Sequence, residues 1–180
     1  EIISSILDIS KIEADRLVVR ATTFAVEPVL DEVRDTLTPL AARQKNTLLV
    51  HAAAGLGEIA SDPTRLRQIL LNVVGNALKF THAGLVELLA AREGDVLTFV
   101  VRDTGIGMDA AELELIFEAF HQADLSSTRS YEGSGLGLTI TRHLCRLLGG
   151  TIGVTSERGV GTTFTITLPA TLPPAQERPD

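Results

Sequence analysis

The sequence predicts an α/β two-layer sandwich, in which one mixed, largely antiparallel sheet of about five strands carries about three helices on one face. Long amphipathic stretches over 28–43 and 63–81 have the periodicity of helices that pack on a sheet. Alternating apolar segments over 85–103 and 151–169 have the pattern of β-hairpins. The 180 residues, 44% of them hydrophobic, are enough for one sizeable core.

The first forty residues combine two helical patterns with a short extended segment. Residues 1–17 place isoleucines along one stripe, which is typical of the end of a long helix packed on another helix. A β-like segment follows over 21–26. Pro28 is then expected to open a helix that continues to about Arg43, because proline suits the first turn.

The next helix is introduced by a strand pattern and a cap. NTLLVH (46–51) predicts a strand, and 58–60 predicts a shorter one. Asp62 is a suitable N-cap and Pro63 a suitable first helical residue, so a helix is expected from there to Thr81.

Residues 104–135 have a different composition, rich in Gly, Ser, Thr and Asp, with a short helical patch near 110–117. So long a stretch with little regular structure is uncommon in a compact domain and is typical of a lid. A helix is expected over 135–148, and the Pro-rich chain after Pro169 is expected to be loose.

Composition excludes several classes of protein. The net charge of −7 has the wrong sign for nonspecific nucleic-acid binding. The single cysteine rules out an internal disulfide and a cysteine metal cluster, which fits a reducing compartment. No apolar run reaches the length of a membrane span, and the helical pattern is already running at Glu1. We therefore expect a cytoplasmic piece of a longer protein, whose remaining part could hold a membrane anchor.

A polar seam interrupts the otherwise apolar helix over 63–81. Asn72, Asn76 and Lys79 are spaced so that all three share one helical face. The pattern is equally compatible with a buried hydrogen-bond network or a solvated face. An amide oxygen is, however, a good ligand for a hard cation, and a lysine one turn away suits a phosphate.

Two glycine motifs favour a ligand site. DTGIGM (103–108) leaves a strand, so its glycines would let the backbone approach a flat ligand and Asp103 could accept a hydrogen bond from an exocyclic amine. GSGLGL (133–138) enters a helix, whose free N–H groups suit anionic phosphates. Residues 105–110 also match the loose dinucleotide pattern G-x-G-x-x-A, but they lack its βαβ context, and a P-loop motif is absent.

Taken in order, the motifs strongly resemble the catalytic and ATP-binding domain of sensor histidine kinases, within the GHKL ATPase superfamily. ILLNVVGNALKFT is similar to the N-box, DTGIGM to the first glycine box, FEAFHQAD to the F-box and GSGLGL to the second glycine box. SILDISKIEA resembles the end of the second helix of the dimerisation and phosphoacceptor domain, and TTFTITLP the family's closing strand.

The resemblance implies a Bergerat-type fold and a division of the chain. Residues 1–18 would end the dimerisation and phosphoacceptor helix, 19–169 would form the catalytic ATP-binding domain, and 170–180 would be a flexible tail. The cofactors implied are ATP and Mg²⁺. The partners implied are a phosphoacceptor histidine domain of the same protein and a response regulator receiver domain, with a homodimer for the full-length protein.

The resemblance also implies roles for individual residues. Asn72, Asn76 and Lys79 would be catalytic, with Asn76 holding Mg²⁺ and Lys79 neutralising phosphate charge. Asp103 would bind the adenine amine, and Thr162 would reach the base through water. The other nucleotide-binding positions implied are Gly105, Ile106, Gly107, Met108, Arg129, Gly133, Ser134, Gly135, Leu136, Gly137 and Leu138. Phe117 and Phe120 would pin the lid to the core, although ordinary packing accounts for them equally well.

The first N-box position bears on the reaction. ATP-hydrolysing members of the superfamily have a Glu there that activates water, and Asn72 occupies it here. An amide is no general base, so the site is expected to hold ATP and deliver its γ-phosphoryl group to an imidazole. The acceptor histidine is expected upstream of residue 1. Glu132 departs from the glycine that relatives often have before the second glycine box.

Three functions are compatible with the motifs. The first is a protein histidine kinase catalytic domain acting in a two-component phosphorelay. The second is a nucleotide-binding pseudokinase or scaffold without transfer activity. The third, which Asn72 disfavours, is a GHKL ATPase.

Overall fold

The computed structural model describes residues 17–118 and 135–173. Residues 1–16 of the expected first helix and residues 119–134 of the expected lid therefore lie outside the described residues. The described helices and strands are, in chain order, β1 Thr22–Ala25, α2 Val26–Arg43, β2 Thr47–Ala52, β3 Glu58–Ser61, α3 Pro63–Phe80, β4 Leu85–Glu93, β5 Val96–Asp103, α4 Ala110–Leu115, α5 Gly137–Leu147, β6 Thr151–Glu157 and β7 Gly161–Pro169.

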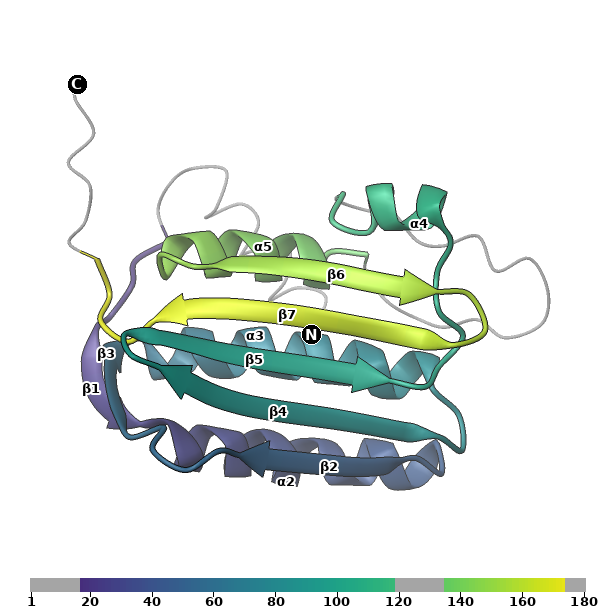
Figure 1. Cartoon of the computed structure of the whole chain (residues 1–180), viewed down its shortest axis with the longest axis horizontal. Coiled ribbons are helices and arrows are strands. Elements are labelled where there is room, and N and C mark those ends of the chain that lie inside the picture. The colour runs from purple at the N-terminus through teal and green to yellow at the C-terminus, as the bar shows by residue number, and fades with distance from the viewer. Residues whose placement is uncertain (1–16, 119–134, 174–180) are drawn as a thin grey trace.

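Five strands form the main sheet, in the order β2-β4-β5-β7-β6 (Figure 1). The β2–β4 pair is parallel, and the other three pairs are antiparallel. Helices α2, α3 and α5 all lie on one face of this sheet (Figure 1). The predicted two-layer sandwich with a mixed, largely antiparallel sheet is confirmed.

The short strands β1 and β3 do not join the main sheet. They pair with each other as an antiparallel ribbon, in a register that runs from Thr22 opposite Ser61 to Ala25 opposite Glu58. The extended patterns at 21–26 and 58–60 therefore predicted strands correctly, while their pairing could not be read from so short a pattern.

The chain after Pro169 differs from the expectation of a loose tail. Ala170 N–H donates to Asp95 O at 2.7 Å, and Leu172 N–H donates to Ala60 O at 2.7 Å. Ala60 N–H in turn donates to Ala170 O at 2.8 Å. Placing the start of the tail at residue 170 was therefore wrong for residues 170–172, because β3 offers this segment backbone hydrogen-bond partners.

The core lies between the sheet and the helices. Alternate residues of β4 and β5 turn inward, as the period of a half-buried strand requires, and they meet the apolar face of α3. The buried residues of these three elements are Val86, Leu88, Ala90, Leu97, Phe99, Val101, Leu66, Ile69, Leu70, Val73, Val74, Ala77 and Leu78. Cys145 of α5 is also buried, and burial raises the pKa of its thiol to about 12, so it acts as a packing residue.

The N-terminus of α3 is fixed by Asp62, as the sequence predicted. Asp62 is buried, and its Oδ1 accepts hydrogen bonds from Thr64 N–H at 3.0 Å and Arg65 N–H at 3.1 Å. Its Oδ2 accepts from Arg20 N–H at 2.9 Å. One carboxylate therefore caps the helix and also holds the chain that enters the domain.

The C-terminus of α3 is fixed by a side chain from another element. Asn46 Nδ2 donates to Leu78 O at 3.0 Å and to Thr81 O at 2.9 Å. Its Oδ1 accepts from Gly84 N–H at 3.1 Å. Carbonyl groups at a helix end need such partners, so Asn46 sets where α3 ends relative to the sheet.

Two helices begin at different residues than predicted. Helix α2 starts at Val26, which places Pro28 within the first turn, where its missing N–H has no helical partner to lose. Helix α5 starts at Gly137, two residues after the predicted start, because Gly135 has a positive φ of 67°.

We predict that Asp62→Ala lowers the free energy of unfolding by about 2–3 kcal/mol, since it removes a cap and leaves Arg20 N–H without its acceptor. Asp62→Asn keeps one acceptor oxygen and should lose about half as much. Urea unfolding followed by circular dichroism measures both. Asp31→Ala, which removes only an exposed ion pair with Arg34, is the control and should change the free energy of unfolding very little. A loss for Asp62→Ala no larger than this control would contradict the assignment.

Candidate functional site

The polar seam of α3 faces α5. Asn72, Asn76 and Lys79 are all half-buried, on the side of the helix away from its apolar face. Asn72 Nδ2 donates to Gly137 O and to Thr141 Oγ1, both at 3.3 Å. The structure therefore brings the middle of α3 to the first turn of α5, so the N-box-like helix meets the end of the second glycine motif.

The other two seam residues differ in their surroundings. Asn76 makes no side-chain hydrogen bond within the described ranges, so its amide oxygen is available to a ligand. The Lys79 ammonium lies 5.1 Å from the centroid of the Phe80 ring, which is cation–π distance. Burial lowers the pKa of Lys79, because a desolvated ammonium is less stable than a hydrated one.

The turn over 103–108 passes between two parts of the backbone with no room for a side chain. A Cβ at Gly105 would overlap the carbonyl oxygen of Phe80, which accepts a hydrogen bond from Ile106 N–H at 3.2 Å. A Cβ at Gly107 would overlap the carbonyl of Glu157, and Gly107 also has a positive φ of 62°. Gly105 is thus required where the chain passes the end of α3, and Gly107 is required where it passes the β6–β7 hairpin.

Asp103 lies at the end of β5 with one oxygen engaged. Its Oδ1 accepts from Gly105 N–H at 2.8 Å and from Thr162 N–H at 3.3 Å. Burial raises the pKa of Asp103, and the two N–H groups oppose that shift in part. Thr81 lies beside this carboxylate. The buried Thr81 hydroxyl makes no well-aligned hydrogen bond in the described part of the chain. It is nevertheless close enough to Asp103 to lower the pKa of that carboxyl group.

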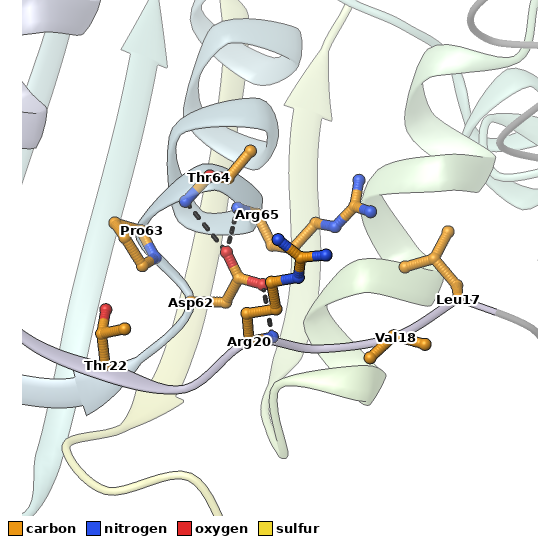
Figure 2. A pocket seen from close by; sticks show the side chains of 8 residues that line it. All are labelled: Leu17, Val18, Arg20, Thr22, Asp62, Pro63, Thr64 and Arg65. Carbon is orange, nitrogen blue, oxygen red and sulfur yellow. Dashed lines mark hydrogen bonds between the residues drawn. The ribbon is translucent and has the colours of Figure 1, made fainter.

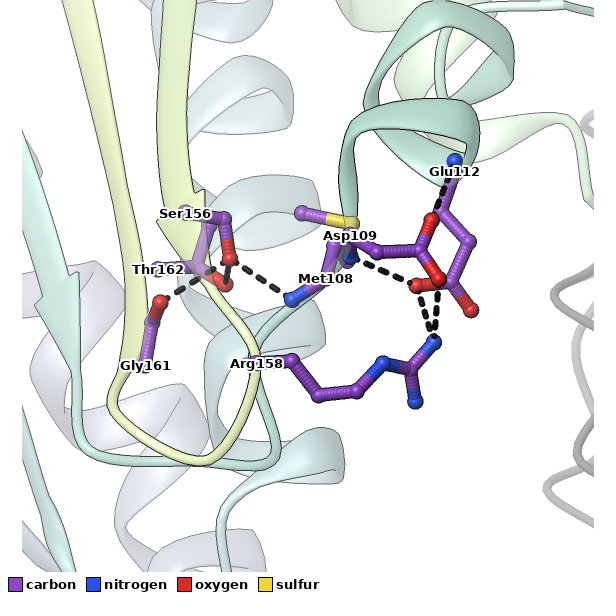
Figure 3. A network of polar contacts seen from close by, with 7 residues as sticks. All are labelled: Met108, Asp109, Glu112, Ser156, Arg158, Gly161 and Thr162. Carbon is purple, nitrogen blue, oxygen red and sulfur yellow. Dashed lines mark hydrogen bonds and ion pairs between the residues drawn. The ribbon is translucent and has the colours of Figure 1, made fainter.

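A hydroxyl pair joins this turn to the β6–β7 hairpin (Figure 3). Met108 N–H donates to Ser156 Oγ at 2.8 Å, and Ser156 Oγ lies 2.9 Å from Thr162 Oγ1. Ser156 also donates to Gly161 O at 2.9 Å. Sequence reasoning missed Ser156, because nothing in TSERG distinguishes it from an exposed residue of an edge strand.

Ion pairs fix the start of α4 beside the same hairpin (Figure 3). Arg158 contacts Asp109 at 3.0 Å and Glu112 at 2.6 Å, and Asp109 and Glu112 form a capping box at the N-terminus of α4. The Glu112 N–H and Arg158 lower the pKa of Asp109. These groups are exposed, so their effect is to orient α4 more than to stabilise the fold.

The remaining predicted positions lie at the start of α5, in the core, or outside the described residues. Gly135, Leu136, Gly137 and Leu138 lie at the start of α5, where Leu136 is buried and its carbonyl accepts from Ile140 N–H. Arg129, Gly133, Ser134, Phe120 and Glu132 lie outside the described residues. Phe117 packs against the core, and the Arg142 guanidinium lies 5.5 Å from its ring centroid. The structure thus describes one side of the predicted phosphate cradle.

A cavity in the described ranges lies away from these residues. It has a volume of about 560 Å³ and lies at the N-terminal end of α3, where Leu17, Arg20, Asp62 and Arg65 line it (Figure 2). Lys79 is one helix length away, roughly 24 Å at 1.5 Å per residue. This cavity is therefore separate from the site that the glycine motifs and the polar seam form.

Helices among the described residues are all too short or too polar to cross a bilayer. Nor do three or more His, Cys, Asp or Glu side chains gather into a metal cluster in those residues. A metal at Asn76 would therefore not be held by a cluster of carboxylates or imidazoles from these residues.

Comparison with known proteins identifies the family. The family described as histidine kinase-, DNA gyrase B-, and HSP90-like ATPase matches residues 61–172. The chain is 39% identical over 175 residues to the autoinducer 2 sensor kinase/phosphatase LuxQ of Vibrio vulnificus, covering 93% of this chain and 20% of that protein. It is 36% identical over 170 residues to the sensor histidine kinase RcsC of Escherichia coli, covering 94% and 18%. The chain thus spans about a fifth of the length of these relatives.

Solved structures agree with the sequence relatives. Full-length ShkA in complex with AMPPNP superposes with a TM-score of 0.83 at 35% identity, over 93% of this chain and 35% of that one. Histidine kinase ThkA in complex with response regulator TrrA has the same fold, with a TM-score of 0.76 at 23% identity over 98% and 48%. The chain belongs to the histidine kinase-, DNA gyrase B- and HSP90-like ATPase family and is a catalytic domain of the sensor histidine kinase type.

Proposed function

We propose that the chain binds Mg·ATP between α3, the 103–108 turn and the start of α5, and transfers the γ-phosphoryl group to a histidine of a dimerisation domain. The observation that carries the proposal is the contact of Asn72 with Gly137, which aligns the polar seam of α3 with the second glycine motif. The similarity to ShkA, whose structure contains the ATP analogue AMPPNP, supports it.

Asp103 would bind the adenine end. Because Oδ1 is engaged by Gly105 and Thr162, Oδ2 is the oxygen left to accept a hydrogen bond from the exocyclic amine. Ile106, three residues after Asp103, is a large apolar residue that is exposed, which suits a wall for a flat base. The Thr162 hydroxyl lies on the strand that contacts Asp103, within reach of the base through water.

The triphosphate would extend along the seam toward α5. Lys79 supplies positive charge, and the first N–H groups of α5 at Gly137 and Leu138 supply hydrogen-bond donors and the positive end of the helix dipole. Arg129, Gly133 and Ser134 would complete the cradle. A nucleotide with its base at Asp103 would therefore have its phosphates between Lys79 and the first turn of α5.

Magnesium fits Asn76. Its amide oxygen has no hydrogen-bond donor within the described ranges, and Mg²⁺ prefers oxygen ligands while keeping several waters. Because those residues offer no carboxylate cluster, the ion would be held jointly by Asn76 and the phosphates. Bound there, it would neutralise charge on the phosphates during transfer.

The residues of this chain would position the phosphates and exclude hydrolysis. In the transfer, the bond from the γ-phosphorus to the ADP oxygen breaks and a bond to an imidazole nitrogen forms. Asn72 cannot remove a proton from water, and its amide hydrogens already bond to Gly137 and Thr141. Catalysis would therefore come from alignment and charge neutralisation, which are the main terms in phosphoryl transfer.

The partners follow from the same proposal. The acceptor histidine would belong to a dimerisation domain of the same protein. Residues 1–18 would be the last part of that domain, and 19–169 would form the catalytic domain. The full-length chain would form a homodimer. The next acceptor would be a response regulator, and ThkA has been solved with one, TrrA. A domain that uses ATP and a response regulator is expected to work in the cytoplasm.

One mixing experiment tests the proposal. The chain is incubated with Mg·ATP labelled on the γ-phosphate and with a separate dimerisation domain that carries its histidine. Acid-labile label on that domain supports a histidine kinase. Tight ATP binding without transfer would instead show a pseudokinase or scaffold, and phosphate release without the dimerisation domain would show an ATPase.

We predict that Asn76→Ala weakens Mg-dependent ATP binding by roughly 100-fold, because even outer-shell partners of a metal are worth 10–100-fold. Asn76→Asp keeps an oxygen ligand and should bind more tightly than the alanine variant. Calorimetry with and without EDTA measures the metal-dependent part, and thermal unfolding checks the fold. An alanine variant that transfers phosphate at the normal rate would rule out the metal assignment.

Asp103→Asn should weaken ATP binding by about 10–100-fold, since an amide nitrogen would then face the donor amine of the base. Binding of inorganic triphosphate should not change. Protonation would turn Oδ2 into a hydroxyl, which is a poorer acceptor for the amine, and burial raises the pKa of Asp103, so ATP affinity should fall on acidification at a higher pH than for an exposed aspartate. Titrations of ATP and triphosphate from pH 8 to 4 test this. Equal losses for both ligands would show that Asp103 does not bind the base.

A further inference from the structure

Ser156 occupies the centre of the contact between the 103–108 turn and the β6–β7 hairpin. It lies on β6 and is half-buried, and three groups surround its hydroxyl: Met108 N–H at 2.8 Å, Gly161 O at 2.9 Å and Thr162 Oγ1 at 2.9 Å (Figure 3). Met108 comes from the turn after β5, while Gly161 and Thr162 begin β7, so Ser156 contacts both sides of this junction.

The hydroxyl of Ser156 has one proton and two acceptors within reach. Met108 N–H always donates, so Ser156 Oγ always accepts there. If the Ser156 proton points to Gly161 O, Thr162 donates to Ser156 and offers a ligand only lone pairs. If it points to Thr162 Oγ1, the Thr162 proton is free to be donated to a ligand. Ser156 thus decides whether Thr162 presents a donor or an acceptor.

The same hydroxyl fixes the position of both sides of the proposed base site. Thr162 is 8% exposed, and its N–H donates to Asp103 Oδ1 at 3.3 Å. Met108 follows the glycine turn that begins at Asp103. Loss of the Ser156 hydroxyl would leave Met108 N–H without its acceptor and Thr162 Oγ1 without its partner, at the two residues that flank the carboxylate.

We propose that Ser156 is a positioning residue for the base: it holds Met108 and Thr162 in place, and the direction in which its one proton points sets whether Thr162 presents a donor or an acceptor to the base. This inference rests on the proposed function, because it assigns a residue to the adenine end of the same site. Ser156 itself acts through Thr162 and Met108 rather than by touching the nucleotide.

The chain contains a matched control. Thr151 and Thr167 form another hydroxyl pair between β6 and β7, 2.8 Å apart and exposed, at the other end of the same two strands. Thr151→Ala removes a cross-strand hydroxyl contact of the same kind without touching the 103–108 turn. Its effect measures what such a contact is worth to the hairpin alone.

The test compares Ser156→Ala, Ser156→Thr and Thr151→Ala with the unaltered chain. ATP, ADP and inorganic triphosphate are titrated by calorimetry, and the KM and kcat of transfer to a separate dimerisation domain are measured. Ser156→Ala should weaken ATP and ADP about tenfold and raise KM by a similar factor, with kcat and triphosphate affinity within about twofold. Ser156→Thr should restore binding because it keeps the hydroxyl, and Thr151→Ala should bind normally. Combining Ser156→Ala with Thr162→Val should cost much less than the product of the two single losses.

The outcomes separate this inference from the proposed function. If the unaltered chain binds no ATP, the proposed function itself fails. If it binds ATP and Ser156→Ala behaves like Thr151→Ala, the positioning role is wrong. Equal loss of ATP and triphosphate in Ser156→Ala, without rescue by Ser156→Thr, would show that Ser156 only maintains the fold, and this too would overturn the inference.

Discussion

The site depends on two glycines of the 103–108 turn, where the backbone runs too close to other segments to leave room for a side chain. Gly105 passes the carbonyl of Phe80 and Gly107 passes the carbonyl of Glu157, at distances that exclude any Cβ. This close approach connects the end of α3 to the β6–β7 hairpin through the loop between them. Asp103 owes its orientation to it, since the N–H groups that fix its carboxylate come from the glycine turn and from Thr162 of β7. Any residue larger than glycine would move the carboxylate by separating these three segments.

Helix α3 is held in place at both of its ends. Asp62 fixes one end of it and Asn46 the other, so its register against the sheet is set by hydrogen bonds from two different segments. One face of the helix fills the core while the opposite face carries the polar seam. Because Asn72 contacts the first turn of α5, the seam has a defined neighbour rather than bulk water. Asn72, whose amide cannot act as a base, therefore also links α3 to α5.

Local signals in the sequence predicted most of the elements and the seam. Asp62 with Pro63 predicted the start of α3, and hydrophobic alternation predicted both β4 and β5, because caps and periodicity are set by neighbouring residues. The partnership of β1 with β3, and the attachment of Ala170 and Leu172 to β3, depend on segments far apart in the chain and left no local pattern. Ser156 was missed for the same reason. Its role arises from what folds against it, and a serine on an edge strand carries no signal of that.

The order of strands in the sheet affects how this protein folds during its synthesis. Strand β5 pairs with β4, which precedes it, and with β7, which begins at Gly161, long after β5 ends at Asp103. At a synthesis rate of 5–20 residues per second, a ribosome would expose one edge of β5 for roughly 3 to 12 seconds before its partner is made. That edge belongs to a strand with Leu97, Phe99 and Val101 on one side, which is the kind of surface that recruits chaperones or aggregates. Translation stalled between these two strands would leave this edge of β5 unpaired until synthesis resumed.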